Sequence, residues 1–163
     1  MTIASGVCGL ALKKDLEQDD GTVRHQYTTG FPAPGMLACS FDPDLIFSVG
    51  KAIGREMQEY GVAFCLAPGC ALQRTPFDAV SQESWSEDPV LTGLCALFFC
   101  KGVQTHGAAI LRTGTLPRSL DIRLSSLRDI YALPFEIAAR ACKAALLPDS
   151  IFNGEALGED CDL

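Results

Sequence analysis

The sequence predicts an α/β fold in which parallel strands alternate with helices. Two stretches begin at an Asp-Pro pair, Asp42-Pro43 and Asp88-Pro89, which is a typical helix start. Short apolar runs lie before and after these helices, and such a repeating order predicts parallel strands joined by right-handed crossovers. The order alone fits both an open doubly wound sheet and part of a (β/α)8 barrel. A complete barrel needs about 250 residues, so we expect only a partial one from these 163 residues.

Composition predicts a single domain over residues 1–163. Apolar residues make up 48% of the chain, so a core of ordinary size is expected. The net charge of −7, without a cluster of Lys and Arg, argues against a nucleic-acid partner. No apolar run reaches the length of about 18–20 residues that a membrane span needs. The first lysines follow the apolar N-terminal stretch, which is unlike a signal peptide, so we expect no membrane association.

The eight cysteines predict buried free thiols in a reducing cytoplasm. They form no C-x-x-C pair, and neither His25 nor His106 stands at zinc-ligand spacing from a cysteine pair. We therefore expect no metal and no other cofactor. A metal site or a disulfide is the alternative interpretation. The cysteines lie mostly inside apolar segments: Cys8, Cys39, Cys65, Cys70, Cys95, Cys100, Cys142 and Cys161.

The N-terminal half predicts strand, loop, strand and helix in that order. Residues 1–12 hold a short strand, residues 13–30 are polar and turn-rich and predict a surface loop, and residues 36–39 form a second strand. Asp42 caps the first long helix, and Gly61 ends it in a left-handed turn. Its apolar residues recur at helical spacing and predict a buried face made of Leu45, Val49, Ala52, Ile53, Met57 and Tyr60.

The C-terminal half continues the alternation. Residues 62–66 form a buried strand, residues 70–88 a long loop, residues 88–105 a second helix and residues 108–111 a further strand. Ser125 or Ser126 is expected to cap a short helix that Pro134 interrupts or restarts. Residues 144–147 form the last expected strand, and residues 155–163 an acidic, frayed tail.

Few polar groups follow the strands, and most have a structural interpretation. Glu87 and Asp88 resemble paired catalytic carboxylates, but at a helix start we expect them to cap the helix. Arg74 could bind an anion or a hydroxyl ligand, although an ion pair with Asp78 or Glu87 within its own loop is the preferred interpretation. His106 is expected at a helix end, away from any site.

Several segments, in the right order, carry a family resemblance that covers about 120 residues. They are GFPAP, FDPDLIFSVGKAIGREMQEYGV, LAPGCALQRTP, SEDPVLTG and KGVQTHGAA, followed by SLRDIYALPFEIA and Phe152-Asn153-Gly154. Together they resemble the N-terminal domain of glycoside hydrolase family 3, the β-glucosidase family. The resemblance implies a (β/α)8 barrel rather than a doubly wound sheet. It also implies cleavage of terminal β-linked sugars with retention, which needs two carboxyl groups about 5–5.5 Å apart.

The positions that the resemblance assigns to sugar contacts are mostly replaced. Ser5 stands where the family has a sugar-binding Asp, and Ala11 stands where it has an Arg. Val80 occupies the place of a second Arg, preceded by Ala79 instead of a Gly. The family's Lys-His pair aligns with Arg112 and Thr113. Arg112 and Arg74 are therefore the candidate substrate-binding residues that remain.

No catalytic residue is assigned. The nucleophile segment is expected some tens of residues after Asn153-Gly154, and Asp160 and Asp162 lie too close to Gly154 to replace it. We expect a β-glucosidase-like chain without activity in isolation, with a carbohydrate as its conceivable ligand. The alternatives are an interaction module that self-associates or binds a partner through exposed sheet edges, a barrel completed by another chain, and a decayed or mis-bounded gene product.

Overall fold

The computed structural model describes residues 2–13, 15–17, 19–77, 81–112, 119–120, 122–142, 144–146, 151–152 and 155–156. The expectations for Asp78, Ala79, Val80 and Thr113 fall outside these ranges, as do those for Asn153, Gly154 and residues 157–163.

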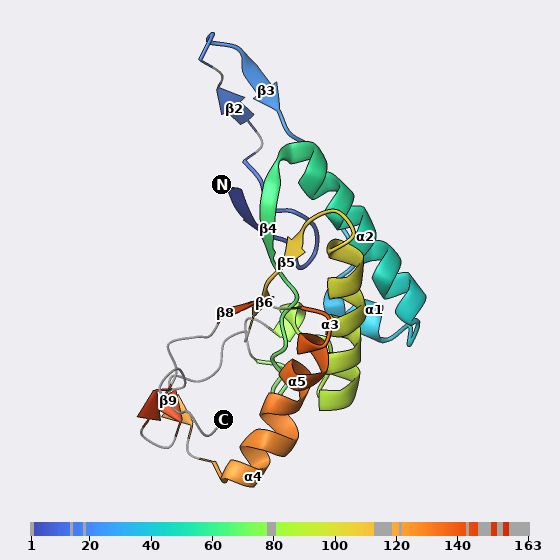
Figure 1. Cartoon of the computed structure of the whole chain (residues 1–163), viewed down its shortest axis with the longest axis vertical. Coiled ribbons are helices and arrows are strands. Elements are labelled where there is room, and N and C mark those ends of the chain that lie inside the picture. Colours follow the sequence, from blue (N-terminus) through green and yellow to red (C-terminus); the bar gives the residue numbers. More distant parts are fainter. Residues whose placement is uncertain are drawn as a thin grey trace.

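Parallel strands form the spine of the structure (Figure 1). β1 (Thr2–Ser5), β4 (Val62–Leu66) and β5 (Ala108–Ala109) make a three-stranded sheet in the order β1-β4-β5, with both pairs parallel. The chain then continues through Ile110 into β6 (Leu111–Arg112), which pairs in parallel with β8 (Ala145–Leu146). The Ile110 N–H donates to the Cys65 carbonyl over 2.9 Å, so β6 extends the line of β5. The spine therefore has four neighbouring parallel positions, formed by strands predicted within residues 1–12, 62–66, 108–111 and 144–147, whereas the strand predicted at residues 36–39 does not form.

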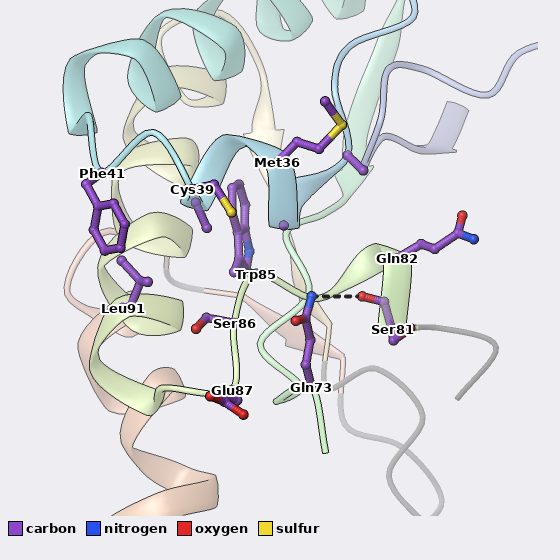
Figure 2. A pocket seen from close by; sticks show the side chains of 13 residues that line it. Met36, Cys39, Phe41, Gln73, Ser81, Gln82, Trp85, Ser86, Glu87 and Leu91 are labelled. Carbon is purple, nitrogen blue, oxygen red and sulfur yellow. Dashed lines mark hydrogen bonds between the residues drawn. The ribbon is translucent and has the colours of Figure 1, made fainter. Parts of the chain in front are cut away.

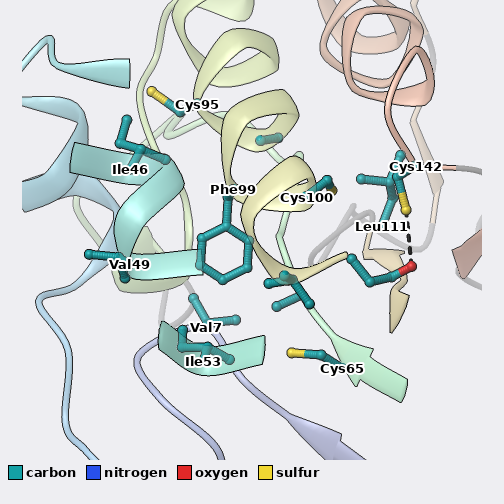
Figure 3. Packing of buried hydrophobic residues seen from close by; sticks show 14 of the residues in the cluster. Val7, Ile46, Val49, Ile53, Cys65, Cys95, Phe99, Cys100, Leu111 and Cys142 are labelled. Atoms are coloured by element: carbon teal, nitrogen blue, oxygen red, sulfur yellow. Dashed lines mark hydrogen bonds between the residues drawn. The ribbon is translucent and has the colours of Figure 1, made fainter. Parts of the chain in front are cut away.

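The helices cover one face of this spine (Figure 1). They are α1 (Pro34–Ala38), α2 (Pro43–Tyr60), α3 (Pro89–Val103), α4 (Leu124–Ser126), a π-helical turn (Leu127–Ala132) and α5 (Leu133–Ala139), and a 3-10 turn spans Ser81–Glu83. Ala4, Cys65 and Ala109 share one row of the sheet and are at most 4% exposed. This row faces the core that α2 and α3 complete (Figure 3). A strand–helix order with helices on one side of a parallel sheet is the architecture of part of a (β/α)8 barrel.

Both long helices begin where the sequence predicts, and α2 also ends there, whereas α3 ends at Val103 and not at residue 105. The Asp42 carboxylate accepts hydrogen bonds from the N–H groups of Asp44 and Leu45 over 2.9 and 3.1 Å, and the Asp88 carboxylate accepts one from Leu91 over 2.6 Å. Gly61 ends α2 with φ = 68°, a left-handed conformation that glycine adopts without steric cost. The local cap signals therefore mark where both helices begin and where α2 ends.

Removal of the α2 cap gives a testable loss of stability. Asp42→Ala leaves two backbone N–H groups without their acceptor, and we expect the free energy of unfolding to fall by about 1 kcal/mol. Asp42→Asn is the matched control, because asparagine caps as well as aspartate and should restore most of the loss. Urea denaturation of the three proteins measures the difference. Equal stability of the Ala and Asn variants would contradict the assigned cap.

The buried face of α2 differs by one position from the expected one. Ile46 is 2% exposed, whereas Leu45, which the spacing assigned to the core, is 42% exposed. The stripe against α3 runs through Ile46, Gly50, Ile53 and Gly54, because two glycines allow α3 to approach there. The prediction for Val49, Ile53 and Met57 is confirmed.

Residues 36–39 do not form a strand. They lie in and just after α1, which Pro34 opens from its first turn, and the Met36 N–H donates to the Ala33 carbonyl over 2.9 Å. The fixed φ of proline favours a helical first turn, and Met36 is 69% exposed, so the apolar run there is not a buried strand. β1 takes the place in the sheet that these residues were expected to fill.

The expected surface loop at residues 13–30 contains an antiparallel hairpin. β2 (Asp15–Glu17) pairs with β3 (Val23–His25), and His25 Nδ1 lies 2.7 Å from the Asp15 carboxylate. The turn between them is held by Asp20, whose carboxylate accepts from the Thr22 N–H over 2.9 Å. The sequence correctly predicts that this segment is polar and exposed, but it does not predict that β2 and β3 pair with each other.

The C-terminal part also departs from expectation. The helical segment begins at Leu124 with Arg123 as its N-cap, and neither Ser125 nor Ser126 caps it. Pro134, expected to interrupt or restart the helix, lies in the first turn of α5, so it restarts the helix at a place where a missing N–H is tolerated. β9 (Ile151–Phe152) pairs in parallel with β7 (Ser119–Leu120) and antiparallel with β10 (Glu155–Ala156). The first two residues of the expected frayed tail are therefore in a strand.

Among the described residues, no helix combines the length and the apolar character needed to cross a bilayer.

Candidate functional site

The candidate site lies where the parallel strands end. Arg112 is the last residue of β6, and its guanidinium donates to the Glu83 carboxylate over 3.2 Å. The side chains are 30% and 44% exposed, so solvent reaches both partners. The Arg112 backbone is fixed as well: its N–H donates to the Pro68 carbonyl and its carbonyl accepts from the Cys70 N–H, over 2.9 and 2.8 Å. A positive group is thus held at the carboxyl edge of the sheet by the segment that follows β4.

Gln73 organises the loop that carries Glu83. Its side-chain amide donates to the carbonyls of Ser81 and Ser84 over 3.1 and 2.9 Å, and its backbone N–H donates to Ser86 over 3.0 Å (Figure 2). Trp85, between these anchors, is 2% exposed and packs edge-on against Phe99 of α3 with ring centroids 5.8 Å apart. The described part of the loop around Glu83 is therefore anchored by these hydrogen bonds and by the buried Trp85 ring. The one tryptophan of the sequence was the available signal for this anchoring.

Two cavities border this loop. The first has a volume of about 530 Å³ between α1, the loop and the start of α3, and Figure 2 shows Met36, Cys39, Phe41 and Leu91 on its apolar side. The second has about 460 Å³ and is lined by polar groups that include Gln73, Arg74 and Glu87. Among the described residues, the Trp85 Nε1–H is the one buried side-chain polar group without a hydrogen-bond partner.

Arg74 and Arg112 are placed differently. Arg74 is exposed, and its guanidinium carbon lies 5.5 Å from the centre of the Tyr131 ring, a cation–π contact. The expected ion pair with Glu87 is wrong, since no described carboxylate lies within 4 Å of the Arg74 guanidinium; Asp78 is outside the described residues. Arg74 thus joins its loop to the π-helical turn, while Arg112 faces Glu83.

The remaining polar candidates have structural roles. Asp88 caps α3, as predicted, and its own N–H donates to the Ser86 hydroxyl over 3.1 Å. Glu87 is exposed and lines both cavities without sharing the cap. His106 is exposed just past the end of α3, at the opposite end of the strands from Arg112, as expected.

The cysteines are free thiols wherever the structure describes them. Cys8 and Cys39 are exposed, and the other five are buried: Cys65, Cys70, Cys95, Cys100 and Cys142. The Cys142 thiol donates to the Ala109 carbonyl over 3.0 Å (Figure 3). Partial burial, and then the nearby charge of Glu83, raises the pKa of Cys8, so this thiol close to the site is a weak nucleophile. No group of three or more His, Cys, Asp or Glu in the described part could hold a metal ion.

The buried thiols predict a loss of stability in alkali. Burial raises the pKa of Cys65 and of Cys70 from 9.0 to about 12. Between these values the unfolded chain releases thiol protons that the folded chain retains, so the free energy of unfolding falls as pH rises above about 9. The limiting slope is about 1.4 kcal/mol per pH unit for each thiol.

Urea denaturation at pH 8 and pH 10 measures this slope. Cys65→Ala is the internal control, because it removes one titrating group and should flatten the dependence even though it lowers stability overall. An unchanged slope in that variant would show that other groups cause the alkaline loss.

Comparison with known proteins identifies the family. The model for the Glycosyl hydrolase family 3 N terminal domain matches residues 3–115, more than half of the chain. The chain belongs to glycoside hydrolase family 3. A probable β-glucosidase J of Neosartorya fischeri is 31% identical over 156 residues, covering 87% of this chain and 18% of its own length. A probable β-glucosidase I of Aspergillus niger is 33% identical over 144 residues, covering 82% of this chain and 18% of its own length.

Solved structures of the family agree with the fold. β-Glucosidase 3B from Thermotoga neapolitana in complex with α-D-glucose superposes with a TM-score of 0.86 at 34% identity, covering 94% of this chain and 23% of that one. The β-glucosidase from Bifidobacterium adolescentis gives 0.81 at 29% identity, covering 94% and 23%. This family 3 chain therefore spans about a fifth of the length of the relatives it matches, and its strands form part of the family's barrel.

Because the chain belongs to family 3, the positions that the resemblance assigns to sugar contacts can be located in the structure. Ser5, at the position that the resemblance assigns to an acidic sugar contact, ends β1 beside Leu66. Ala11 donates its backbone N–H to the Ser5 carbonyl over 2.8 Å, so the loop between them is closed on itself. Among the described positions that the resemblance assigns to sugar contacts, Ser5 and Ala11 are uncharged, whereas the candidates Arg74 and Arg112 carry a charge. The pairing of Arg112 with Glu83 was not predicted.

Proposed function

We propose that this chain is a β-glucosidase-type domain of family 3 that does not itself hydrolyse glycosides, a pseudoenzyme. The observation that supports it is the ion pair between Arg112 and Glu83 at the carboxyl edge of the sheet. Retaining hydrolysis needs two carboxyl groups about 5–5.5 Å apart, one of them a nucleophile. Glu83 is already committed to Arg112, while Ser5 and Ala11 carry no charge.

The same edge supports weak contact with a sugar. Arg112 has five N–H donors, and its side chain is 30% exposed, so donors that do not face Glu83 can meet hydroxyl oxygens. Glu83 is 44% exposed and can accept from a hydroxyl. The polar cavity beside Gln73 and Arg74 is a second place where hydroxyl groups would find partners. We propose a carbohydrate ligand on these grounds, with Arg112 as the principal contact and Arg74 as a peripheral one.

Titration of the isotope-labelled chain with D-glucose tests this contact. We expect saturable amide shifts centred on Arg112 and Glu83, and their loss in Arg112→Met. Arg140→Met is the matched control, because Arg140, at the C-terminal end of α5, forms an exposed ion pair with Glu136 over 3.5 Å and lines neither of the two cavities beside the loop. Absence of saturable shifts in the unmodified chain, or their persistence in Arg112→Met, would refute Arg112 as a sugar contact.

We also propose a cytoplasmic location. Five of the seven described cysteines are buried free thiols, which suits a reducing compartment. A second candidate function, that of an interaction module, is favoured by the side of the sheet that the described helices do not cover (Figure 1), where Ile3 is 50% and Leu146 is 51% exposed.

A further inference from the structure

Four of the buried cysteines lie close together, although they come from three separate parts of the chain. Cys100, on α3, is fully buried, and Cys142, just after α5, is 2% exposed. Cys65 and Cys70, on and after β4, are at most 1% exposed. A hydrogen bond with Cys142, burial, and the charges of Cys142, Cys70 and Cys65 all raise the pKa of Cys100. The candidate site at the carboxyl edge does not use this group of thiols.

Two contacts, one helical turn apart, join α3 to the segment that follows α5. Residues four apart in a helix lie on the same face, so Cys100 and Gln104 both face this segment. The Gln104 side-chain amide donates to the Ala141 carbonyl over 2.8 Å. At the next residue, the Cys142 sulfur is hydrogen-bonded to the Cys100 thiol. Figure 3 shows these two cysteines beside one another, on the far side of α3 from Val49.

The position of the Cys142 sulfur is fixed from both sides. The Cys142 N–H donates to the Ala138 carbonyl of α5 over 3.0 Å. The sulfur lies 3.0 Å from the Ala109 carbonyl oxygen of β5 and 3.3 Å from that of Ala144. The Ala144 carbonyl also accepts from the Leu111 N–H of β6 over 2.9 Å. Cys142 is therefore held between the end of α5 and the strands, and the Cys100 thiol is its sulfur neighbour.

We propose that Cys100 and Cys142 are a reversible modification site, in which a peroxide converts the two thiols into a disulfide and cellular thiols reduce it again. The fold, through the contacts between α3 and the end of α5, selects these two among the eight cysteines. The inference goes beyond the proposed function, because it requires neither sugar binding nor the absence of hydrolysis. Disulfides of this kind form transiently in a reducing compartment.

The two sulfur atoms have different roles. The hydrogen bond from Cys100 lowers the pKa of Cys142 below its ordinary 9.0 and outweighs the opposing effect of burial. The thiolate is the reactive form, so Cys142 is the attacking sulfur. Cys100 keeps its proton and is the second, resolving sulfur. Burial raises the pKa of Cys65 and of Cys70 to about 12, so these two neighbours stay as unreactive thiols.

The oxidation balances with one peroxide per pair. The Cys142 thiolate attacks one peroxide oxygen, so an S–O bond forms, the O–O bond breaks, and the departing hydroxide takes up the thiol proton as water. The Cys100 sulfur then attacks the Cys142 sulfur: the S–S bond forms, the S–O bond breaks, and hydroxide leaves with the Cys100 proton as a second water. Two thiols lose two electrons in total, and the peroxide gains two. Because both thiols are buried, a reagent as small as hydrogen peroxide is required, and it enters through brief local opening.

Peroxide treatment of the full 163-residue chain tests the pairing. Cys8, Cys39 and Cys161 are first replaced by serine, so that only the five buried cysteines remain. After one equivalent of hydrogen peroxide, we expect two of these five thiols to be lost, and dithiothreitol should restore both. Alkylation with N-ethylmaleimide in denaturant counts the thiols that remain.

Peptide mapping identifies the partners. Trypsin, which cleaves after Lys and Arg, releases Cys100 in peptide 75–101 and Cys142 in peptide 141–143, and the disulfide joins these two peptides. Peptide 75–101 also contains Cys95, a thiol of the same helix that is 3% exposed, so Cys95→Ser is the matched control. The link should form in Cys95→Ser and be absent in Cys100→Ser. Thiol loss should slow by about tenfold or more in Cys142→Ser.

The same treatment in urea gives a readout that does not depend on whether a variant folds. If the fold selects the pair, the denatured chain should show no preference for the link between residues 100 and 142. Retention of all five thiols in the folded chain, a link from Cys142 to Cys70, oxidation to sulfinic acid without a link, or an equal yield of the 100–142 link in urea would each overturn the proposal.

Discussion

Replacing Phe99 with alanine is expected to lower the free energy of unfolding by about 3–5 kcal/mol. Phe99 of α3 is fully buried and packs edge-on against Trp85. Figure 3 shows its ring pointing into the cluster beside Ile53 and Val49 of α2. The substitution removes the contact between α3 and the loop that carries Glu83, so it should also loosen the candidate site. Equilibrium denaturation monitored by Trp85 fluorescence measures both effects.

Phe77→Ala is the control for this prediction. Phe77 is 95% exposed, and the same truncation there should change stability by no more than about 0.5 kcal/mol. Similar losses for Phe77 and Phe99 would mean that the cluster around Phe99 is not the core of the chain.

Gly102→Ala should be the second most damaging change, with a net loss of about 2 kcal/mol. A Cβ on Gly102 would overlap the Phe47 carbonyl oxygen and would lie 2.7 Å from the Lys51 backbone nitrogen, both on α2. These are backbone atoms, so relief requires α2 and α3 to move apart. The higher helix propensity of alanine offsets only about 1 kcal/mol of that cost.

Gly30→Ala is the control for Gly102. A Cβ there meets no atom within 4 Å, so stability should stay within about 0.5 kcal/mol of the unmodified chain. Thermal melts of the two variants separate steric overlap between helices from a general effect of losing glycine. A Gly102→Ala chain as stable as Gly30→Ala would contradict the close approach of α2 and α3.

Elements defined by local chemistry could be predicted from sequence. Asp42, Gly61 and Asp88 act on backbone groups within a few residues, so the ends of α2 and the start of α3 were identified correctly. The strand β4 was predicted in full because it is a short apolar run bounded by Gly61 and Pro68. The resemblance to family 3 then selected a barrel over an open sheet, a choice that strand order alone leaves open.

Features that depend on distant contacts could not be predicted. The helical periodicity predicted that Leu45 is buried. Which side of α2 is buried depends on where α3 crosses it, and the close approach at Gly50, Gly54 and Gly102 sets that crossing point. The periodicity of α2 alone does not contain this information. The hairpin of β2 and β3 depends on cross-strand pairing in a segment whose composition is that of a loop. The apolar run near Met36 predicted a strand, but Pro34 opens a helix there, α1.

In the candidate site, too, the sequence pointed to single residues but not to the contacts between distant segments. Arg112 was proposed from its alignment with a family position, but its partner Glu83 is 29 residues away in sequence, and no local pattern relates the two. The contact of Arg74 with Tyr131 joins two loops that no sequence spacing relates. The assignment of Arg112 and Arg74 to sugar contacts therefore stays a prediction, and the structure shows the partner of each: Glu83 for Arg112 and the Tyr131 ring for Arg74.

Incubation of the isolated 163-residue chain with an aryl β-glucoside tests the central claim most directly. The arrangement at the carboxyl edge, with Glu83 held by Arg112 and neutral residues at positions 5 and 11, predicts phenol release no faster than in buffer. Glu83→Gln, purified in the same way, controls for contaminating enzyme. Release that scales with the amount of chain and disappears in Glu83→Gln would contradict the claim, because it would show that this edge holds a working catalytic carboxylate.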